Sequence, residues 1–251
     1  MLRAMPPTRP PRIVITVSVA AVQPDPGLAH RKTALYVDSV VRHGATAVPI
    51  DAAAPAATRG AALASMDGLM LTGGADVDPV HYGQPNNGSY GIEADRDELE
   101  AAAFAAATAR GVPVLGICRG LQAMNAFSGG SLLQHVDGHA GPGWGHGPAH
   151  THSLRLVPGT ATARILDPAA SGAELLVNSY HHQAVRVADL APGYMATAFS
   201  DSPAGPIVEA LEGAAGGPWR LAVQCHPERT ESTPRAFEHL FAAFVEACRA
   251  R

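Results

Sequence analysis

The sequence is poor in the residue types that mark secreted, membrane-spanning and nucleic-acid-binding proteins. Its 251 residues include only three cysteines, an odd number that forms no disulfide framework and fits a reducing compartment. Charged residues make up 16% of the chain and the formal net charge is −4, which favours neither nucleic acid nor an anionic membrane as a partner. No apolar run reaches the roughly 18 residues that a membrane-spanning helix needs. These absences favour a cytoplasmic globular protein.

The N-terminus has a superficial likeness to a secretion signal, because arginines at positions 3, 9 and 12 precede the apolar residues 13–22. Prolines at positions 6, 7, 10 and 11 break the basic region, and the run Ile-Val-Ile-Thr-Val-Ser-Val is typical of a buried strand. We therefore expect residues 1–10 to be a flexible tail. Residues 11–251 show no linker or repeat, so we expect them to form one domain.

Alternating apolar runs and helical segments predict an α/β fold. After the first strand, the sequence predicts a helix over 31–43 that buries Leu35, Val37, Val40 and Val41. It also predicts a long helix over 93–110. Further strands are expected at 47–50, 66–71 and 112–117, with a Pro- and Ala-rich connection before the second of these. This order indicates a mostly parallel sheet with helices on both faces, whose active site lies at the carboxyl ends of the strands.

The second half of the chain predicts a less regular set of elements. We expect strands at 151–157, 174–178, 207–211 and 219–224, with the last two as candidates for antiparallel pairing. An amphipathic helix over 234–249 closes the chain. It should bury Phe237, Leu240, Phe241, Phe244 and Val245.

The most informative stretch is residues 113–122, Pro-Val-Leu-Gly-Ile-Cys-Arg-Gly-Leu-Gln. Its first half predicts a strand and its second half predicts the first turn of a helix. The Gly-x-Cys-x-Gly layout between them is typical of a nucleophile elbow, where glycines relieve the crowding of a sharp turn. Such a turn would place the Cys118 sulfur at a helix N-terminus, which favours the thiolate. A buried structural cysteine is the less favoured alternative.

A partner for Cys118 lies in the segment Val-Gln-Cys-His-Pro-Glu at 223–228. The proline after His226 favours extended backbone, and residues i and i+2 of an extended segment point to the same side. Glu228 would then orient one ring nitrogen of His226 while the other nitrogen faces the nucleophile, as in a catalytic triad. The His-x-Glu pattern is weak evidence alone and becomes strong evidence beside the elbow.

Five histidines lie close together between positions 135 and 152. Their spacing matches no common metal-ligand pattern, and no cysteine lies near them. We therefore favour a His- and Gly-rich surface loop over the site, and the sequence predicts neither a metal nor a cofactor. The histidines concerned are His135, His139, His146, His150 and His152.

Six motifs carry a resemblance that covers nearly the whole chain. They are Leu-Thr-Gly-Gly-Ala-Asp-Val-Asp-Pro (71–79), Asp-Arg-Asp (95–97), Gly-Ile-Cys-Arg-Gly-Leu-Gln (116–122), Gly-Gly-Ser-Leu-Leu-Gln (129–134), Asn-Ser-Tyr-His-His-Gln (178–183) and the 223–228 segment. In these motifs the sequence resembles the class I glutamine amidotransferase superfamily, and within it the stand-alone γ-glutamyl-γ-aminobutyrate (γ-glutamyl-GABA) hydrolases. The resemblance implies a flavodoxin-like three-layer sandwich with a mostly parallel central sheet and a small antiparallel extension. Cys225 departs from the family, which more often has an aromatic residue there; we expect this thiol to point away from His226.

The resemblance also implies a reaction. Cys118 would attack the side-chain amide carbon of a γ-glutamyl group, while His226 takes the thiol proton and later protonates the leaving amine. Water would then release glutamate from the thioester. Backbone N–H groups of Arg119 and Gly74 would hold the oxyanion.

The α-amino and α-carboxylate groups of the glutamyl moiety are assigned by the same resemblance. They would be held by Gln122 and by the segment Ser179, Tyr180 and His181. The alternative for Gln122 is an ordinary amide on the helix surface. The alternative for His181 and His182 is structural hydrogen bonding, which for His182 is as favoured as substrate binding. The residues Asp76, Asp95 and Arg96 are expected to make loop and capping contacts.

Two functions of different class fit these motifs. The favoured one is a self-sufficient hydrolase of γ-glutamyl-GABA or another γ-glutamyl amine, which the resemblance connects with the breakdown of the polyamine putrescine. The alternative is a glutaminase subunit that delivers ammonia to a separate synthase. A non-catalytic relative is disfavoured because Cys118, His226 and Glu228 are all present. The small-molecule γ-glutamyl substrate is the only partner that the first function needs, and a homodimer stays open.

Overall fold

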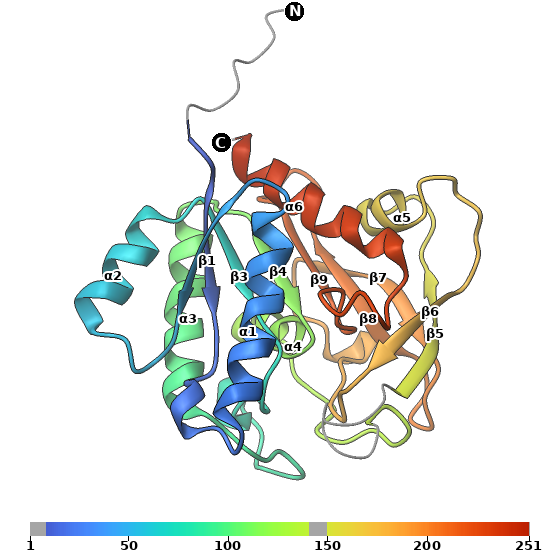
Figure 1. Cartoon of the computed structure of the whole chain (residues 1–251). Helices are drawn as coiled ribbons and strands as arrows, with labels where there is room; N and C mark the ends of the chain where they lie inside the picture. The colour runs from blue at the N-terminus through green and yellow to red at the C-terminus, as the bar shows by residue number, and fades with distance from the viewer. Residues whose placement is uncertain (1–8, 141–149, 251) are drawn as a thin grey trace, which may run out of the picture.

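The computed structural model describes residues 9–140 and 150–250, which contain one nine-stranded sheet (Figure 1). Its strand order is β2-β1-β3-β4-β9-β8-β7-β5-β6. The five strands from β2 to β9 run parallel, and the rest of the sheet is antiparallel. The strands are β1 (Arg12–Thr16), β2 (Thr46–Ile50), β3 (Gly68–Leu71), β4 (Val114–Ile117), β5 (His150–Leu156), β6 (Leu175–Ser179), β7 (Tyr194–Ser200), β8 (Ile207–Gly213) and β9 (Arg220–Val223).

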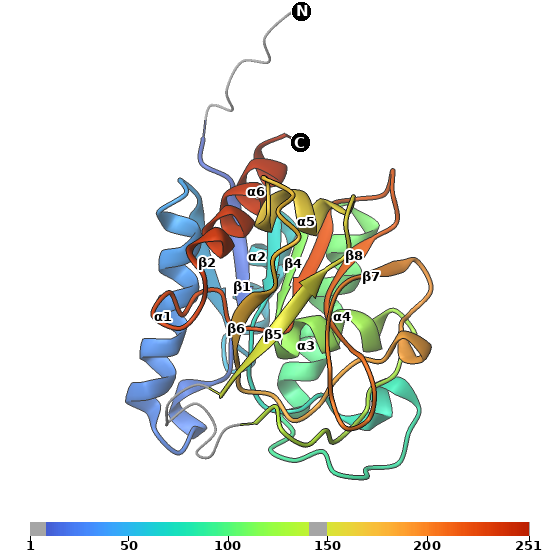
Figure 2. The same ribbon diagram turned by 90° about the vertical axis from the view of Figure 1, so that its right-hand side faces the viewer.

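Helices cover both faces of this sheet (Figures 1 and 2). Helices α1, α5 and α6 pack on one face, and α2, α3 and α4 pack on the other. The predicted three-layer α/β sandwich with a mostly parallel centre is therefore confirmed. The helices are α1 (Pro26–Val41), α2 (Ala56–Ser65), α3 (Ala94–Ala109), α4 (Arg119–Phe127), α5 (Ala161–Leu166) and α6 (Glu238–Arg249), with short 3₁₀ turns at Ala20–Val22, Pro79–Tyr82, Val187–Asp189 and Arg235–Phe237.

The central strands are buried on both faces, as the continuous apolar runs in the sequence predict. Successive residues of β3 alternate between the two cores, so that Met70 packs with α1 and α6 while Leu69 and Leu71 pack with α3 and α4. The predicted buried face of the last helix is confirmed, because Phe237 and four apolar residues of α6 are at most 1% exposed. This packing fixes the carboxyl ends of β3, β4 and β9 side by side.

The first helix differs from the prediction of 31–43. It begins at Pro26, because the Asp25 side chain accepts a hydrogen bond from Leu28 N (2.8 Å) and proline suits the first helical position. The predicted buried face is also shifted: Leu35 and Val41 are 36% and 48% exposed, whereas Tyr36 is buried. The helix is therefore rotated about its axis relative to the prediction, and the Tyr36 phenol, instead of Leu35, faces the interior.

Several elements were missed in the sequence, and the antiparallel part is larger than the small extension expected. Helix α2 occupies the Pro- and Ala-rich connection and buries only Ala62, so it has no apolar periodicity to reveal it. Helix α5 has six residues, and β7 shows no clear alternation of buried and exposed residues. None of the described helices is long and apolar enough to span a membrane.

Two further sequence expectations concern the ends of the described ranges. Residues 1–8 of the predicted tail lie outside them, and Arg9 forms an ion pair with Asp67 (2.7 Å). Of the histidine-rich stretch, His146 lies outside the described residues. The surface-loop expectation is wrong for His139, which is 3% exposed, and for His152, which belongs to β5.

Candidate active site

The turn between β4 and α4 has the geometry of a nucleophile elbow. Cys118 has φ 54° and ψ −109°, a backbone conformation that is rare for residues other than glycine. Its N–H donates to Val223 O of β9 (2.8 Å), which ties the elbow to the neighbouring strand. A Cβ atom at Gly120 would lie 2.1 Å from Leu71 O, so a side chain there would push α4 away from β3. The crowding inferred from the Gly-x-Cys-x-Gly spacing is therefore present.

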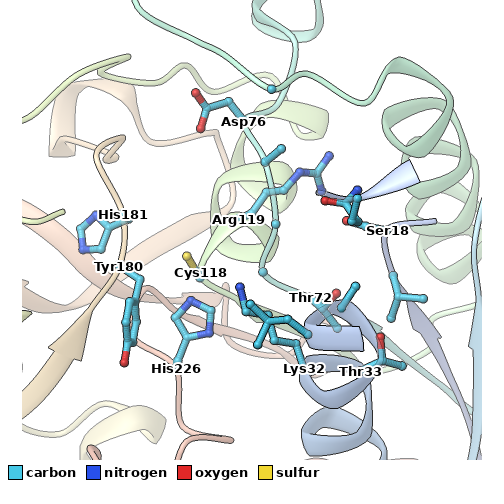
Figure 3. Close-up of a pocket in the computed structure, with 18 of the residues that line it drawn as sticks. Ser18, Lys32, Thr33, Thr72, Asp76, Cys118, Arg119, Tyr180, His181 and His226 are labelled. Carbon is cyan, nitrogen blue, oxygen red and sulfur yellow. The ribbon is translucent and has the colours of Figure 1, made fainter. Parts of the chain in front are cut away.

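His226 and Glu228 follow β9 and lie beside this elbow, as Figure 3 shows for His226 and Cys118. The His226 Nδ1–H donates to Glu228 Oε1 (2.7 Å), which is the predicted contact, although the backbone there forms a turn and is not extended as expected. Asn178 of β6 holds the His226 backbone at both ends: its Oδ1 accepts from His226 N (2.8 Å) and its Nδ2 donates to His226 O (3.0 Å). The imidazole is thus held in place by a carboxylate and by a clamp on its main chain.

The charges around His226 favour its protonated form. Burial alone would lower the pKa of His226, but the Glu228 carboxylate and the Cys118 sulfur, which also hydrogen-bonds the ring, raise it from 6.5 to about 9. His226 is therefore protonated near neutral pH, so that an imidazolium and the Cys118 sulfur form a pair. An imidazolium beside a cysteine favours attack by its sulfur.

The pH profile should report this pair. We expect kcat/KM for a γ-glutamyl amide to fall above about pH 9, where the free enzyme loses the His226 proton. Glu228→Gln should move this fall to lower pH, because it removes the carboxylate that raises the pKa. The His226 imidazole also makes the free energy of unfolding decrease as the pH rises from 6.5 to 9, because the folded state binds its proton more tightly than the unfolded state does. An alkaline limit that is unchanged in Glu228→Gln would contradict this assignment.

The loop after β3 forms the opposite wall of the site. Gly73 N donates to the Tyr36 hydroxyl (3.2 Å), and the same hydroxyl lies 3.4 Å from His226 Nδ1. A Cβ atom at Gly73 would lie 2.6 Å from His226 Cε1, and one at Gly74 would lie 2.0 Å from Arg96 Nη1. Both glycines are therefore required for the loop to approach its neighbours. Tyr36 was missed in the sequence, where only helical apolar spacing was considered.

A buried ionic network holds the loop that follows β3. Arg96 Nη2 donates to Thr72 O (3.0 Å) and Gly73 O (3.1 Å), which fixes the peptide that precedes Gly74. Glu100 accepts from Arg96 Nε (2.9 Å) and also from Arg119, the first residue of α4. The network thus couples the two backbone positions, Gly74 and Arg119, that were predicted to hold the oxyanion. The structural role expected for Arg96 agrees with these contacts.

The site opens into a cavity of about 320 Å³. Of the residues predicted to bind substrate, Gln122, Tyr180 and His181 line this cavity, as do Cys118, Gly74 and Arg119. Ser179 does not line it, and its hydroxyl donates to His139 O. The Gln122 amide donates to Gln183 O and Gln224 Oε1 (both 3.1 Å), so its side chain is already engaged. Binding of the glutamyl group by these residues stays a prediction.

His182 and Asp76 also line the cavity, as a buried pair. The His182 Nε2 lies 2.9 Å from Asp76 Oδ2, and the Tyr90 ring stacks on the imidazole with centroids 4.5 Å apart. Asp76 also accepts from Tyr90 N (2.8 Å), so it holds the loop that follows β3. These contacts agree with the structural alternative for His182 and with the loop contact expected for Asp76.

Two cations in the cavity were not singled out in the sequence. Lys32 of α1 is the only lysine in the chain, and Figure 3 shows its amine beside His226 and Cys118. Burial and the nearby Arg229 charge lower the pKa of Lys32. The Arg229 guanidinium lies over the Tyr180 ring, 4.1 Å from its centroid. A lone lysine in an arginine-rich sequence was the available signal for this side of the site.

The other two cysteines do not compete with Cys118. Cys225 is fully buried, and burial together with the Glu209 carboxylate raises the pKa of its thiol well above the usual range. Its nucleophilic thiolate is therefore suppressed. Cys248 is 3% exposed in α6, where it packs against β3 near Gly68.

Comparisons with known proteins agree with the family resemblance found in the sequence motifs. Residues 13–228 match the family Peptidase C26. A Mycobacterium tuberculosis protein named "Putative glutamine amidotransferase" is 38% identical over 197 residues, which is 75% of this chain and 58% of that relative's length. The γ-glutamyl-γ-aminobutyrate hydrolase PuuD of Escherichia coli is 32% identical over 197 residues, covering 74% of this chain and 73% of that protein.

The fold is also found among solved structures. A glutamine amidotransferase from Methylobacillus flagellatus superimposes with a TM-score of 0.60 at 15% identity, covering 96% of each chain. At this identity the likeness concerns the fold alone. The family match extends over most of the chain and includes the elbow, the His226–Glu228 segment and the loop after β3. This protein belongs to the peptidase C26 family of class I glutamine amidotransferase-like hydrolases.

Proposed function

We propose that the protein is a self-sufficient cysteine hydrolase that cleaves γ-glutamyl amines, such as γ-glutamyl-GABA, into glutamate and the free amine. The observation that carries the proposal is Cys118 on its elbow, beside a His226 whose Nδ1–H is held by Glu228 at 2.7 Å. The 32% identity to γ-glutamyl-GABA hydrolase adds support for the substrate class. This combination fits acyl transfer through a covalent thioester.

In this mechanism the Cys118 thiolate attacks the γ-amide carbon, and the carbonyl oxygen becomes an oxyanion. Gly74 and Arg119 line the cavity, and their backbone N–H groups are the proposed donors to that oxyanion. His226 then gives its proton to the leaving nitrogen, and the C–N bond breaks. A water molecule, deprotonated by His226, attacks the thioester and releases glutamate, which restores the thiolate.

The leaving amine should lie on the His226 side of the thiol, because His226 protonates it. Figure 3 shows Tyr180 and His181 on one side of Cys118 and Lys32 on the other. Lys32 on this second side and Arg229, which lies over the Tyr180 ring, give the cavity around His226 a positive charge. This favours an amine whose far end carries a carboxylate, as GABA does.

Lys32→Met tests the recognition of that carboxylate. We expect KM for γ-glutamyl-GABA to rise about 10- to 100-fold, the loss of one charge-assisted hydrogen bond, while KM for the neutral analogue γ-glutamyl-butylamide changes little. Arg31→Met is the matched control, since Arg31 is the neighbouring cation of α1 and its side chain is 69% exposed. An equal loss for both substrates would instead place Lys32 at the glutamyl group or in the chemistry.

The decisive experiment measures free glutamate released by the purified chain alone, with γ-glutamyl-GABA and glutamine in parallel. Rapid release from γ-glutamyl-GABA without any partner is the expected result. Release from glutamine alone would favour the alternative, a glutaminase that supplies ammonia to a separate synthase. Failure to release glutamate from any γ-glutamyl amide would overturn the proposed hydrolase.

A further inference from the structure

Three histidines and a glutamate meet in the antiparallel half of the sheet, outside the catalytic triad. They are His139, His152 on β5, His181 after β6 and Glu209 on β8, and we call them the His–Glu cluster. One ligand atom from each of His139, His152 and Glu209 lies within 4.8 Å of the others. The Nε2 atoms of His152 and His181 lie 3.6 and 3.8 Å from Glu209 Oε1. Glu209 is fully buried, and His139 and His181 are 3% and 4% exposed.

The hydrogen bonds of this cluster determine where its protons are. Each imidazole places Nδ1 against a backbone carbonyl: His139 on Asp137 O (3.3 Å), His152 on Ser153 O (3.2 Å) and His181 on Gln183 O (2.9 Å). A carbonyl only accepts, so each Nδ1 carries the proton and each neutral ring presents an Nε2 lone pair.

The Nε2 lone pairs find no donor in the described structure. Ser200 lies 3.4 Å from His139 Nε2, but its hydroxyl donates to Glu209 Oε1 (2.8 Å). Among the described residues, His152 Nε2, His181 Nε2 and Glu209 Oε2 have no hydrogen-bond partner. Lone pairs that converge in a buried site without a donor are costly, and one shared proton would satisfy only one of them.

We propose that the His–Glu cluster binds a divalent transition-metal ion, for which Zn²⁺ has the best-matched ligand chemistry. Neutral imidazole Nε2 and carboxylate oxygen are common zinc ligands, and Nδ1–H bonds to backbone carbonyls are the usual outer contacts that orient such histidines. Tetrahedral ligands at zinc distances stand about 3.3 Å apart. The contacts of 3.6 and 3.8 Å to Glu209 therefore need only small shifts to reach that spacing.

The proposed metal site lies next to the active-site cavity, and its position gives a bound ion a structural role. A bound ion would join β5, β8 and the segment before residue 141 to His181, which also lines the active-site cavity. It would thereby fix the strand end that carries Tyr180 and His181. The spacing of the histidines in the sequence did not reveal this site, because the fourth ligand, Glu209, lies on a distant strand.

The test measures Zn²⁺ bound per purified full-length chain by mass spectrometry of the elements after dialysis, and by competition with a chromogenic chelator. We expect about one tightly bound ion per chain, and a melting temperature raised by about 5–10 °C at free Zn²⁺ roughly a hundredfold above Kd. Co²⁺ in its place should give the strong visible absorption of a tetrahedral site. His152→Asn and Glu209→Gln should each weaken Zn²⁺ binding by at least about 100-fold. His239→Asn, an exposed histidine of α6, is the control and should bind Zn²⁺ unchanged.

If Glu209→Gln fails to fold, His139→Asn keeps the test available, because His139 lies in a loop segment between α4 and β5. Comparing melting curves in the presence of EDTA separates loss of the site from loss of the fold. Absence of Zn²⁺ binding above the level of a histidine-poor reference protein would overturn the proposal. So would binding that all three cluster variants retain, since the ion would then be adventitious.

Discussion

Cys118→Ala is expected to slow glutamate release from γ-glutamyl-GABA by roughly 10⁴- to 10⁶-fold, because the covalent route is lost when the nucleophile is removed. The elbow gives the reason that no other group replaces it. Cys118 is the cysteine that lines the cavity beside His226, whereas Cys225 is fully buried with a raised thiol pKa. The measurement is the steady-state rate of glutamate release at saturating substrate.

Cys225→Ala is the matched control for this loss. It removes a second thiol one residue before His226 and should leave the rate within a few-fold of the original, because that thiol is not in the reaction. In acid-quenched samples, a mass increase equal to a glutamyl group in the native protein would identify the thioester. The same increase should be absent from Cys118→Ala. Activity that survives in Cys118→Ala would show that the elbow does not carry the nucleophile.

Glu100→Ala should lower the free energy of unfolding by about 3–5 kcal/mol, the range for breaking a buried ion pair by removing one partner. Glu100 is fully buried and accepts from Arg96, Arg119 and the Thr16 hydroxyl (2.8 Å). Although burial opposes its ionisation, the charges of Arg119 and Arg96 keep the pKa of Glu100 below its usual value. Without this carboxylate, two guanidinium groups that are each 2% exposed lose a counter-charge.

Urea unfolding of Glu100→Ala measures this effect, and Glu98→Ala is its control. Glu98 is an exposed residue of the same helix, so its loss should change stability by no more than about 0.5 kcal/mol. We also expect a lower kcat in Glu100→Ala, since Arg96 holds the carbonyls of Thr72 and Gly73. A stability change below about 1 kcal/mol would show that the network does not hold the loop as described.

Local patterns predicted the centre of this protein well. Apolar runs of strand length located β1, β3 and β4, and the amphipathic pattern located α6, because each of these elements is buried along a regular face. The glycines around Cys118 predicted the elbow for a local steric reason: φ at Cys118 is positive, and both flanking positions are too crowded for a side chain. The contact from His226 to Glu228 was predicted from extended backbone, but it forms within a turn in which Arg229 N donates to His226 O (3.2 Å).

Other features were decided by tertiary structure. Helix α2 buries one alanine and has no periodic signal, so its position depends on packing beside β1 and β2. The direction of α1 brings Tyr36 and Lys32 to the cavity, which requires the rotation of the helix as well as its existence. Three regions that lie far apart in the chain, around residues 139–152, 181 and 209, bring His139, His152, His181 and Glu209 together.

The sequence by itself determined the α/β class, the elbow at Cys118 and the contact of His226 with Glu228, because these depend on interactions between residues close in the chain. Only the tertiary structure decided which side chains line the cavity beside Cys118 and which histidines share a buried site. Those relations depend on strand order, with β8 placed between β9 and β7, and on helix rotation. Both are set by packing between distant elements, which short-range spacing does not encode.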